Sequence, residues 1–301
     1  MTPGNRFRYN QVMATSSGLT SDNASGAIDL TGENVHWDLR EAMSYADYLH
    51  LPELLACQRP LTRQHDEALF ITIHQASELW MKLCLHEIGA AMHHIRADDL
   101  GPAFKMMARV ARVQVNLIQS WEILSTMTPA DYSGFRSALG KSSGFQSYQY
   151  RMLEFRLGNK NRDMARVYES KPEISAQVQA ALTEPSIYDE SLALLARRGL
   201  PIPQEKLSRD FSEAYVSDPL VTEAWRQIYR DAETHWDLYE LAEKLVDLEY
   251  RFHLWRFSHM KTVERIIGAK PGTGGTSGVS YLQKALNLRF YPELWDVRTE
   301  I

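Results

Sequence analysis

The stretch RFHLWRFSHMKTVERIIGAKPGTGGTSG, residues 251–278, joins a helical repeat to a glycine-rich end. One histidine and several apolar residues recur in it at spacings of three and four: Phe252, Trp255, His259, Val263 and Ile266. Residues at these spacings share one side of an α-helix, so the pattern predicts a helix that turns His259 towards the interior. A buried imidazole needs a hydrogen bond, a charge or a metal.

The end of this stretch predicts a loop with little stiffness of its own. Gly268 is a typical helix stop, and four more glycines follow: Gly272, Gly274, Gly275 and Gly278. A buried histidine beside a mobile flap would suit an enzyme with a bound cofactor. The alternative is a core histidine with an ordinary hydrogen-bond partner, followed by a surface loop.

The remaining segments from residue 33 onwards also show helical patterns, without an alternating strand run or an Asn-Gly hairpin. We therefore predict an all-α fold, a single domain over residues 33–301 built as a bundle of long helices. No proline or glycine occurs between Leu220 and Ile267. One straight helix of that length would span about 70 Å, so we expect a bend or break. The other main helices are predicted at Trp37–Leu55, interrupted at Pro52, at Asp66–Ile95 and at Pro102–Met127.

Two helix starts carry strong capping signals. Thr128 precedes a proline and lies three residues before an aspartate, which predicts a capped short helix that Gly140 ends. Ser143 lies three residues before a glutamine, which predicts a second capped helix that runs to Gly158.

Composition places the chain among ordinary globular proteins. It has 301 residues, 44% of them hydrophobic and 24% charged, and its net charge of -5 argues against nucleic acid or an anionic membrane as the main partner. No run is long enough to span a membrane, and the N-terminus lacks a secretory signal core. Two cysteines, Cys57 and Cys84, fit a reducing, cytoplasmic location. Residues 1–32 are rich in Ser, Thr, Asn and Gly and are expected to be disordered.

A second histidine, His74, lies near the apolar stripe of the helix predicted at Asp66–Ile95. Phe70 precedes it by about one turn and Ser77 follows it by about one turn, so the three share a face. Two helices far apart in the sequence thus each place one histidine near the core. A haem pocket needs such an arrangement, with one imidazole on the iron and a polar group opposite. The alternative is two core histidines with satisfied hydrogen bonds.

A candidate anion pocket follows in the sequence. Tyr132 and Arg136 are four residues apart on the short capped helix, and a guanidinium beside a phenol suits a carboxylate. The helix start at Ser143 and Gly144 adds free N–H groups. The alternative is a surface pair between an arginine and an acid.

Three stretches carry a resemblance to a known family. They are FITIHQASELWMKL (70–83), DYSGFRSALGKSSGFQSYQYRMLEFRLGNKN (131–161) and LWRFSHMKTVERIIGAKPGTGGTSGVSYL (254–282), with a weaker match at SYADYLHLPELL (44–55). From about residue 35 to its end, the chain closely resembles bacterial tryptophan 2,3-dioxygenases. The related indoleamine dioxygenases lack the histidine found here at position 74.

The resemblance implies an all-helical, homotetrameric enzyme with haem b. Such enzymes use ferrous haem and O2 to cleave the indole C2–C3 bond of L-tryptophan. The product is N-formyl-L-kynurenine, and the reaction is the first step of tryptophan catabolism by the kynurenine pathway.

It also implies roles for residues around the iron. His259 would be the proximal ligand, and His74 the distal residue that accepts a hydrogen bond from the indole N–H. Phe70 would pack on the indole. Ser143 and Gly144 would line the haem pocket.

Further roles concern the amino-acid end of the substrate. Arg136 would hold the carboxylate with Tyr132 beside it, and Thr273 would meet the same end as the loop orders over it. Tyr45 and Tyr48 resemble N-terminal residues that reach into a neighbouring subunit's site. The alternative function, a haem-binding sensor or carrier without turnover, would not need such a clamp. A purely structural helical scaffold would need neither clamp nor haem.

Overall fold

The computed structural model describes residues 28–301, which form two compact units that divide after Leu55. The first unit holds two short helices, α1 (Tyr45–Tyr48) and α2 (Leu51–Leu55), neither of which buries a residue. Most of the predicted disordered extension, residues 1–27, lies outside the described residues, and residues 28–32 are exposed coil and turn.

The predicted helix at Trp37–Leu55 is wrong over its first half. Residues 37–44 are not helical, because Asp38 accepts hydrogen bonds from the backbone and side chain of Arg40 in a local turn. Ser44 then takes an extended conformation and caps α1 through a capping box. Pro52 does not interrupt a helix: it is the second residue of α2, where its missing N–H has no helical partner to lose.

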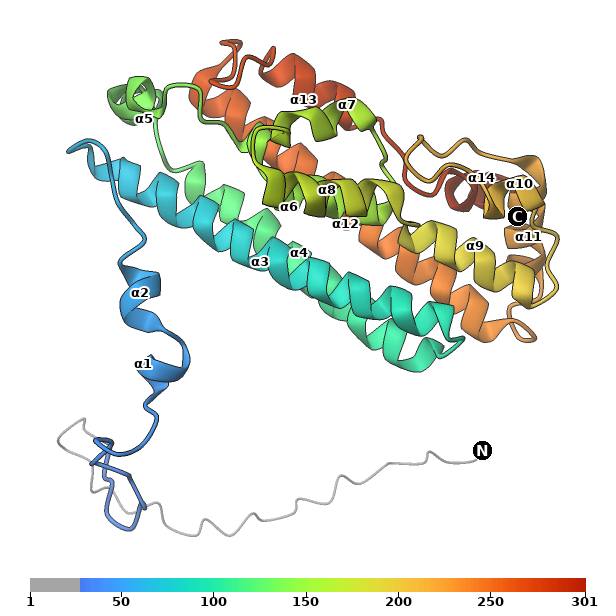
Figure 1. Ribbon diagram of the computed structural model, residues 1–301, viewed down its shortest axis with the longest axis horizontal. Coiled ribbons are helices and arrows are strands. Elements are labelled where there is room, and N and C mark those ends of the chain that lie inside the picture. The colour runs from blue at the N-terminus through green and yellow to red at the C-terminus, as the bar shows by residue number, and fades with distance from the viewer. Residues whose placement is uncertain (1–27) are drawn as a thin grey trace, which may run out of the picture. The chain divides into compact units, whose positions relative to one another are not determined.

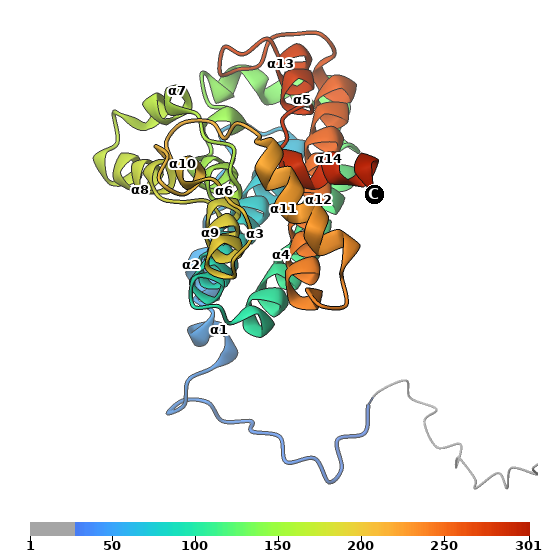
Figure 2. The ribbon, with the colours of Figure 1, turned by 90° about the vertical axis from the view of Figure 1, so that its right-hand side faces the viewer.

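The second unit, Ala56–Ile301, is organised around three long helices. They are α3 (His65–Arg96), α4 (Leu100–Leu124) and α12 (Trp236–Ile267). Helix α4 packs against both α3 and α12, and Figures 1 and 2 show the three running side by side. The predictions for α3 and α4 are confirmed to within a few residues. Helices α3 and α12, which are 140 or more positions apart in the sequence, therefore pack against the same neighbour, α4.

The inner side of α3 follows the predicted apolar stripe. Ile73 and Ile88 are buried in the main hydrophobic core. The other members of the stripe are partly buried and pack against that core: Leu69, Phe70, Trp80 and Leu83. At about 25 cal/mol per Å² of apolar surface removed from water, this packing is the main stabilising contribution to the bundle.

The predicted break between Leu220 and Ile267 is confirmed. Helix α11 (Pro219–Arg230) ends in a turn, and α12 begins at Trp236. Asp231 leaves the helical region with φ -129° and ψ 60°, which turns the chain before α12 starts. The second of these helices alone is 32 residues long and carries His259.

The capping predictions are confirmed at both starts, with one correction. Thr128 and Asp131 form a capping box at α5 (Pro129–Arg136), and the 3-10 helix η1 (Ser137–Leu139) continues it up to Gly140. Ser143 caps only a 3-10 turn, η2 (Gly144–Gln146), and not the long helix expected. Ser147 has an extended backbone, which interrupts the helical run, and its side chain caps α6 (Tyr148–Leu157). Helix α6 ends at Gly158, which has a left-handed conformation.

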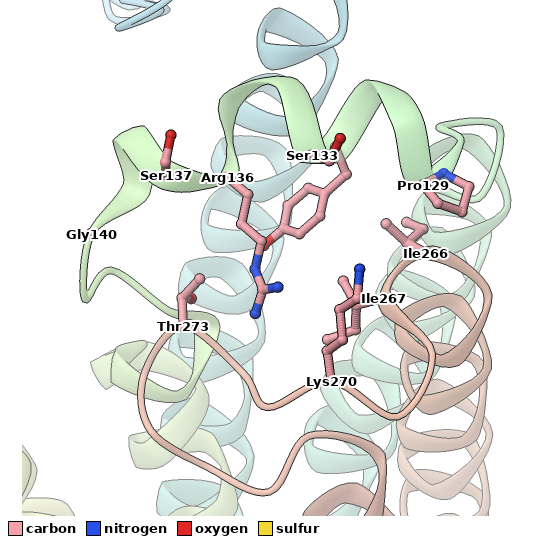
Figure 3. Close-up of a pocket in the computed structure, with 10 residues that line it drawn as sticks. Pro129, Ser133, Arg136, Ser137, Gly140, Ile266, Ile267, Lys270 and Thr273 are labelled. Carbon is pink, nitrogen blue, oxygen red and sulfur yellow. The ribbon is translucent and has the colours of Figure 1, made fainter.

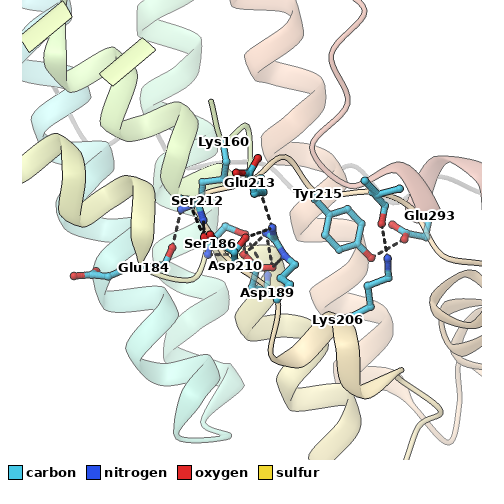
Figure 4. Close-up of polar contacts among 12 residues, drawn as sticks. Lys160, Glu184, Ser186, Asp189, Lys206, Asp210, Ser212, Glu213, Tyr215 and Glu293 are labelled. Atoms are coloured by element: carbon cyan, nitrogen blue, oxygen red, sulfur yellow. Dashed lines mark hydrogen bonds and ion pairs between the residues drawn. The ribbon is translucent and has the colours of Figure 1, made fainter. Parts of the chain in front are cut away.

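Shorter helices and loops cover α6 and the far end of α3. Buried Lys160 donates hydrogen bonds to the carbonyls of Ala181 and Glu184, both at 2.7 Å, and so satisfies carbonyl groups at the end of α8 (Pro172–Thr183). An ion pair of 2.9 Å between Arg209 and Asp189 ties the next loop to the start of α9 (Ile187–Arg197), and Figure 4 shows Asp189 beside Ser186 and Asp210. These helices are α7 (Arg162–Ala165), η3 (Arg166–Tyr168), α8 (Pro172–Thr183), α9 (Ile187–Arg197) and α10 (Gln204–Leu207).

The C-terminal helices α13 (Val279–Ala285) and α14 (Pro292–Glu300) fold back onto α12. Glu249, fully buried on α12, accepts hydrogen bonds from the backbone N–H groups of Phe290 and Tyr291 and from the indole of Trp295. Residues 28–301 contain no β-strand, which confirms the all-α fold. No helix in this range is both long and apolar enough to cross a membrane.

Candidate functional site

A row of aromatic rings runs from α5 into the bundle. Phe70 on α3 lies 4.1 Å from His74, 6.0 Å from Tyr132 and 5.6 Å from Phe135, measured between ring centroids. Phe135 is fully buried, so α5 is anchored to the bundle by its apolar side. The structure thus brings three of the predicted site residues, Phe70, His74 and Tyr132, into one contact group.

The hydrogen bond of His74 fixes which ring nitrogen faces the site. Nδ1 lies 2.7 Å from the carbonyl oxygen of Phe70, one turn earlier, and a carbonyl can only accept. Nδ1 therefore carries the proton, which leaves Nε2 with a free lone pair. Burial lowers the pKa of His74 below its ordinary value, so the ring is neutral at pH 7. His74 is accordingly an acceptor.

His259 on α12 stacks on a tryptophan. Its ring lies 4.5 Å from that of Trp121 on α4, with 17° between the planes, and 6.2 Å from that of Trp255. Burial, with a smaller effect of nearby His74, lowers the pKa of His259 to about 4. The side chain keeps an intermediate accessible surface. It is therefore surrounded by protein without being fully covered, as a ligand to a bound group must be.

Both predicted histidines contact Trp121. Its ring contacts that of His74 edge-on at 6.3 Å and stacks on that of His259. Because α4 lies between α3 and α12, one residue of α4 can touch both. The two imidazoles are near enough for the pKa of one to respond to the other.

The polar atoms around His259 fit a haem. Neither ring nitrogen of His259 has a hydrogen-bond partner among the described residues, which leaves the imidazole available to a ligand. The indole nitrogens of Trp121 and Trp255 are also buried without partners. Residues 28–301 hold no group of three His, Cys, Asp or Glu side chains able to bind a metal ion. A haem would need one protein ligand to its iron and mainly apolar surroundings, and His259 among the rings of Trp121 and Trp255 fits that need.

A cavity of about 410 Å³ opens beside this row of rings, between α5, the end of α12 and the glycine-rich loop (Figure 3). Its walls combine apolar side chains with hydroxyls and two cationic groups. The lining residues are Pro129, Tyr132, Ser133, Arg136, Ser137, Gly140, Ile266, Ile267, Lys270 and Thr273.

Arg136 spans this cavity from α5 to the loop. Its Nη2 donates to the carbonyl oxygen of Pro271 at 2.7 Å, and its charge partly offsets the rise that burial causes in the pKa of Tyr132. Arg136 forms no ion pair with a described residue, so the alternative of a surface arginine–acid pair is not what the structure shows. The guanidinium keeps further N–H groups for a ligand carboxylate.

The glycine-rich loop lies directly on the predicted haem-pocket residues. Thr273 Oγ1 donates to the carbonyl oxygen of Ser142 at 2.6 Å. A Cβ on Gly274 would lie 2.7 Å from the Cβ of Ser143, closer than such atoms approach. Only glycine fits there, and the loop backbone therefore packs on Ser143, which starts the turn that contains Gly144.

Two predicted residues lie outside this group, and two unpredicted ones lie within it. Tyr45 and Tyr48 belong to the first unit, where their side chains are 75% and 71% exposed. Trp121 and Lys270 were not predicted. In the sequence, Trp121 cannot be distinguished from the other apolar residues of a buried helix. Lys270 could have been singled out, because it is a charged residue within the glycine-rich loop.

Comparison with known proteins identifies the family. The family model described as tryptophan 2,3-dioxygenase matches residues 31–301. The chain belongs to the tryptophan 2,3-dioxygenase family. Relatives with that name include proteins from Erythrobacter litoralis, 58% identical over 87% of this chain and 100% of the relative, and from Polaromonas, 55% identical over 89% and 92%. A third, from Bacillus cereus, is 54% identical over 89% and 96%. The predicted resemblance and enzyme class are confirmed.

The contact between Gly274 and Ser143 predicts the behaviour of the loop in this family member. Gly274→Ala should lift the loop off Ser143, because the added methyl has no room. Overpacking of this kind costs about 1–3 kcal/mol, which destabilises the packed loop. Amide hydrogen exchange of residues 268–278 should therefore become about tenfold faster. Gly101→Ala, whose Cβ would meet nothing within 4 Å, is the matched control. Unchanged loop exchange in Gly274→Ala would contradict the contact.

Proposed function

We propose that the chain is a haem-dependent dioxygenase that uses O2 to cleave the indole C2–C3 bond of L-tryptophan. The product is N-formyl-L-kynurenine, the first intermediate of tryptophan catabolism by the kynurenine pathway. One observation carries the proposal beyond family membership. His74, neutral and with a free Nε2, contacts Phe70 and Trp121, and Trp121 also stacks on an unpartnered His259; a cavity that holds an arginine lies beside Phe70 and Tyr132.

The cofactor of the proposal is haem b, ferrous in the active state, with His259 as the iron ligand. When bound, the haem supplies the iron chemistry that activates O2. His259 suits the role because its pKa of about 4 keeps the ring neutral, with a lone pair available for iron. Trp121 stacks on the imidazole and so restricts its rotation. Ser143 and Gly144, under the loop, are proposed to line the haem.

The indole ring is positioned by Phe70 and His74. Phe70 offers an aromatic face beside His74, and stacked rings of this kind contribute about 0.5–1.5 kcal/mol beyond buried area. The free Nε2 of His74 accepts the indole N–H. An indole ring that packs against Phe70 and donates one hydrogen bond to His74 has a fixed orientation. Reaction with O2 at the C2–C3 bond alone requires such an orientation.

The amino-acid end of L-tryptophan lies in the cavity. Arg136 binds the carboxylate through the N–H groups of its guanidinium, and the phenol of Tyr132 lies beside it. Thr273 meets the same end from the loop. Since Arg136 already holds the loop through Pro271, closure of the loop and binding of the carboxylate involve one side chain. The closed loop keeps water from the reacting atoms.

The proposal includes a homotetramer in which Tyr45 and Tyr48 contribute to a neighbouring subunit's site. It is supported by the first unit itself, whose short helices bury nothing and expose large apolar side chains. Isolated helices of four and five residues are not stable in water without a packing partner. We also propose a cytoplasmic location, in keeping with the low number of cysteines.

A non-catalytic haem sensor or carrier is not favoured. A carrier needs an iron ligand and an apolar pocket, but not a separate cavity that presents an arginine, a phenol and a threonine to a small molecule. The family's named activity argues in the same direction.

His259→Ala should abolish stable haem incorporation, because the substitution removes the proposed iron ligand. The haem content of purified protein, measured by its pyridine complex, checks this. His93→Ala, an exposed histidine on α3, should retain full haem. A His259→Ala protein with full haem and activity would refute the assignment of the ligand.

His74→Ala should keep its haem and lose activity. The missing acceptor leaves the indole N–H unpaired, at a cost of about 1–3 kcal/mol, so kcat/KM should fall roughly 10- to 100-fold. Haem content and steady-state rates are measured on the same preparation. Loss of haem from this variant would mean that the two histidines have exchanged roles.

Arg136→Leu should raise KM for L-tryptophan steeply, because the carboxylate loses a charged hydrogen-bonding partner worth about 1.5–3 kcal/mol. Steady-state kinetics measure the change, and haem content shows that the pocket is intact. An unchanged KM would exclude Arg136 as the carboxylate clamp.

A further inference from the structure

Lys270 is a second cation in the cavity beside Arg136. Its side chain lines the cavity, and Figure 3 shows it rising from the loop while Arg136 descends from α5. Other lysines of the chain are paired, such as Lys244 with Glu240 and Lys261 with Glu264. The ammonium of Lys270 has no hydrogen bond or ion pair with any residue of the range 28–301.

The cavity provides no acid to balance these two charges. None of its ten lining residues is an aspartate or glutamate. Asp131, on the same short helix, is engaged by the N–H and hydroxyl of Thr128 in the capping box. In a chain with a net charge of -5, the cavity is therefore a local positive region. Cationic groups set in low-dielectric walls attract small anions and raise their local concentration.

The backbone holds Lys270 at this place. Its N–H donates to the carbonyl of Ile267 at the end of α12, and the next residue, Pro271, accepts the hydrogen bond from Arg136. On the other side of the loop, Gly278 has φ +64°, and a Cβ there would lie 2.6 Å from the Lys270 carbonyl oxygen. The Lys270 backbone is thus fixed at both sides, while its side chain remains free to reach a ligand.

We infer that Lys270 is a second carboxylate-binding residue of this cavity, which draws carboxylate-bearing substrates into the site and favours them over the corresponding amines. The inference rests on the proposed function. Arg136 is already bonded to the loop, whereas Lys270 is unengaged and exposed, so an incoming carboxylate meets Lys270 first. An ammonium is a compact charge without directional preference, suited to capture, and the guanidinium fork then sets the orientation.

This assignment predicts a defined kinetic pattern in haem-loaded enzyme. Lys270→Gln should lower kcat/KM for L-tryptophan about fivefold at about 0.01 M salt, with kcat little changed, because an exposed charge acts on capture. The loss should shrink at about 1 M salt, where charges are screened beyond roughly 3 Å. Lys270→Arg should restore most of kcat/KM. Lys284→Gln, an exposed lysine outside the cavity, changes the net charge equally and should behave as wild type.

Binding without turnover completes the test. In equilibrium dialysis without O2, Lys270→Gln should weaken L-tryptophan binding about fivefold and leave binding of tryptamine, which lacks the carboxylate, unchanged or improved. Unchanged kcat/KM, equal losses for both ligands, a loss insensitive to salt, or an equal loss in Lys284→Gln would each overturn the role of Lys270. If wild-type enzyme forms no product from L-tryptophan, the proposed function fails, whereas normal wild-type turnover with a silent Lys270→Gln variant removes this inference alone.

Discussion

The position of α4 between α3 and α12 is the constraint on which the site depends. Because α4 touches both neighbours, Trp121 can stack on His259 and contact His74 at the same time. Two histidines separated by most of the chain are thereby held against one indole ring. The desolvation that lowers their pKa values keeps both neutral. Neutral imidazoles can ligate iron or accept a hydrogen bond, and a charged one can do neither.

The second element of the site is a positively charged cavity bounded by the glycine-rich loop, in which two positions accept only glycine. Gly274 packs where any side chain would collide with Ser143, and Gly278 adopts a conformation that favours glycine. Arg136 and Thr273 bind the loop to α5 and to the turn before η2. The residues that recognise an amino acid are therefore also the residues that hold the loop in place.

Local patterns predicted much of this architecture. The spacing of apolar residues in α12 and the two capping boxes depend on neighbours within a few residues, and the structure confirms them. The break between Leu220 and Ile267 was predicted from the length of that segment, but its place before Trp236 was not. Two local features were predicted wrongly. Residues 37–44 are not helical, because the Asp38 side chain accepts a hydrogen bond from the backbone of Arg40. The helix expected from Ser143 is interrupted at Ser147, because Ser147 caps a separate helix. The role of Trp121 could not be predicted, since it arises only when three helices meet. The role of Arg136 depended on the resemblance as much as on spacing.

The most direct test of the account is the absorption spectrum of the purified, reduced protein, followed after addition of L-tryptophan in air. We expect a haem Soret band and the growth of a near-ultraviolet band of N-formylkynurenine. A Soret band without product would point to a binding or sensing role. Protein prepared with ample haem that shows no Soret band would contradict the assignment of His259 and, with it, the site built around Trp121.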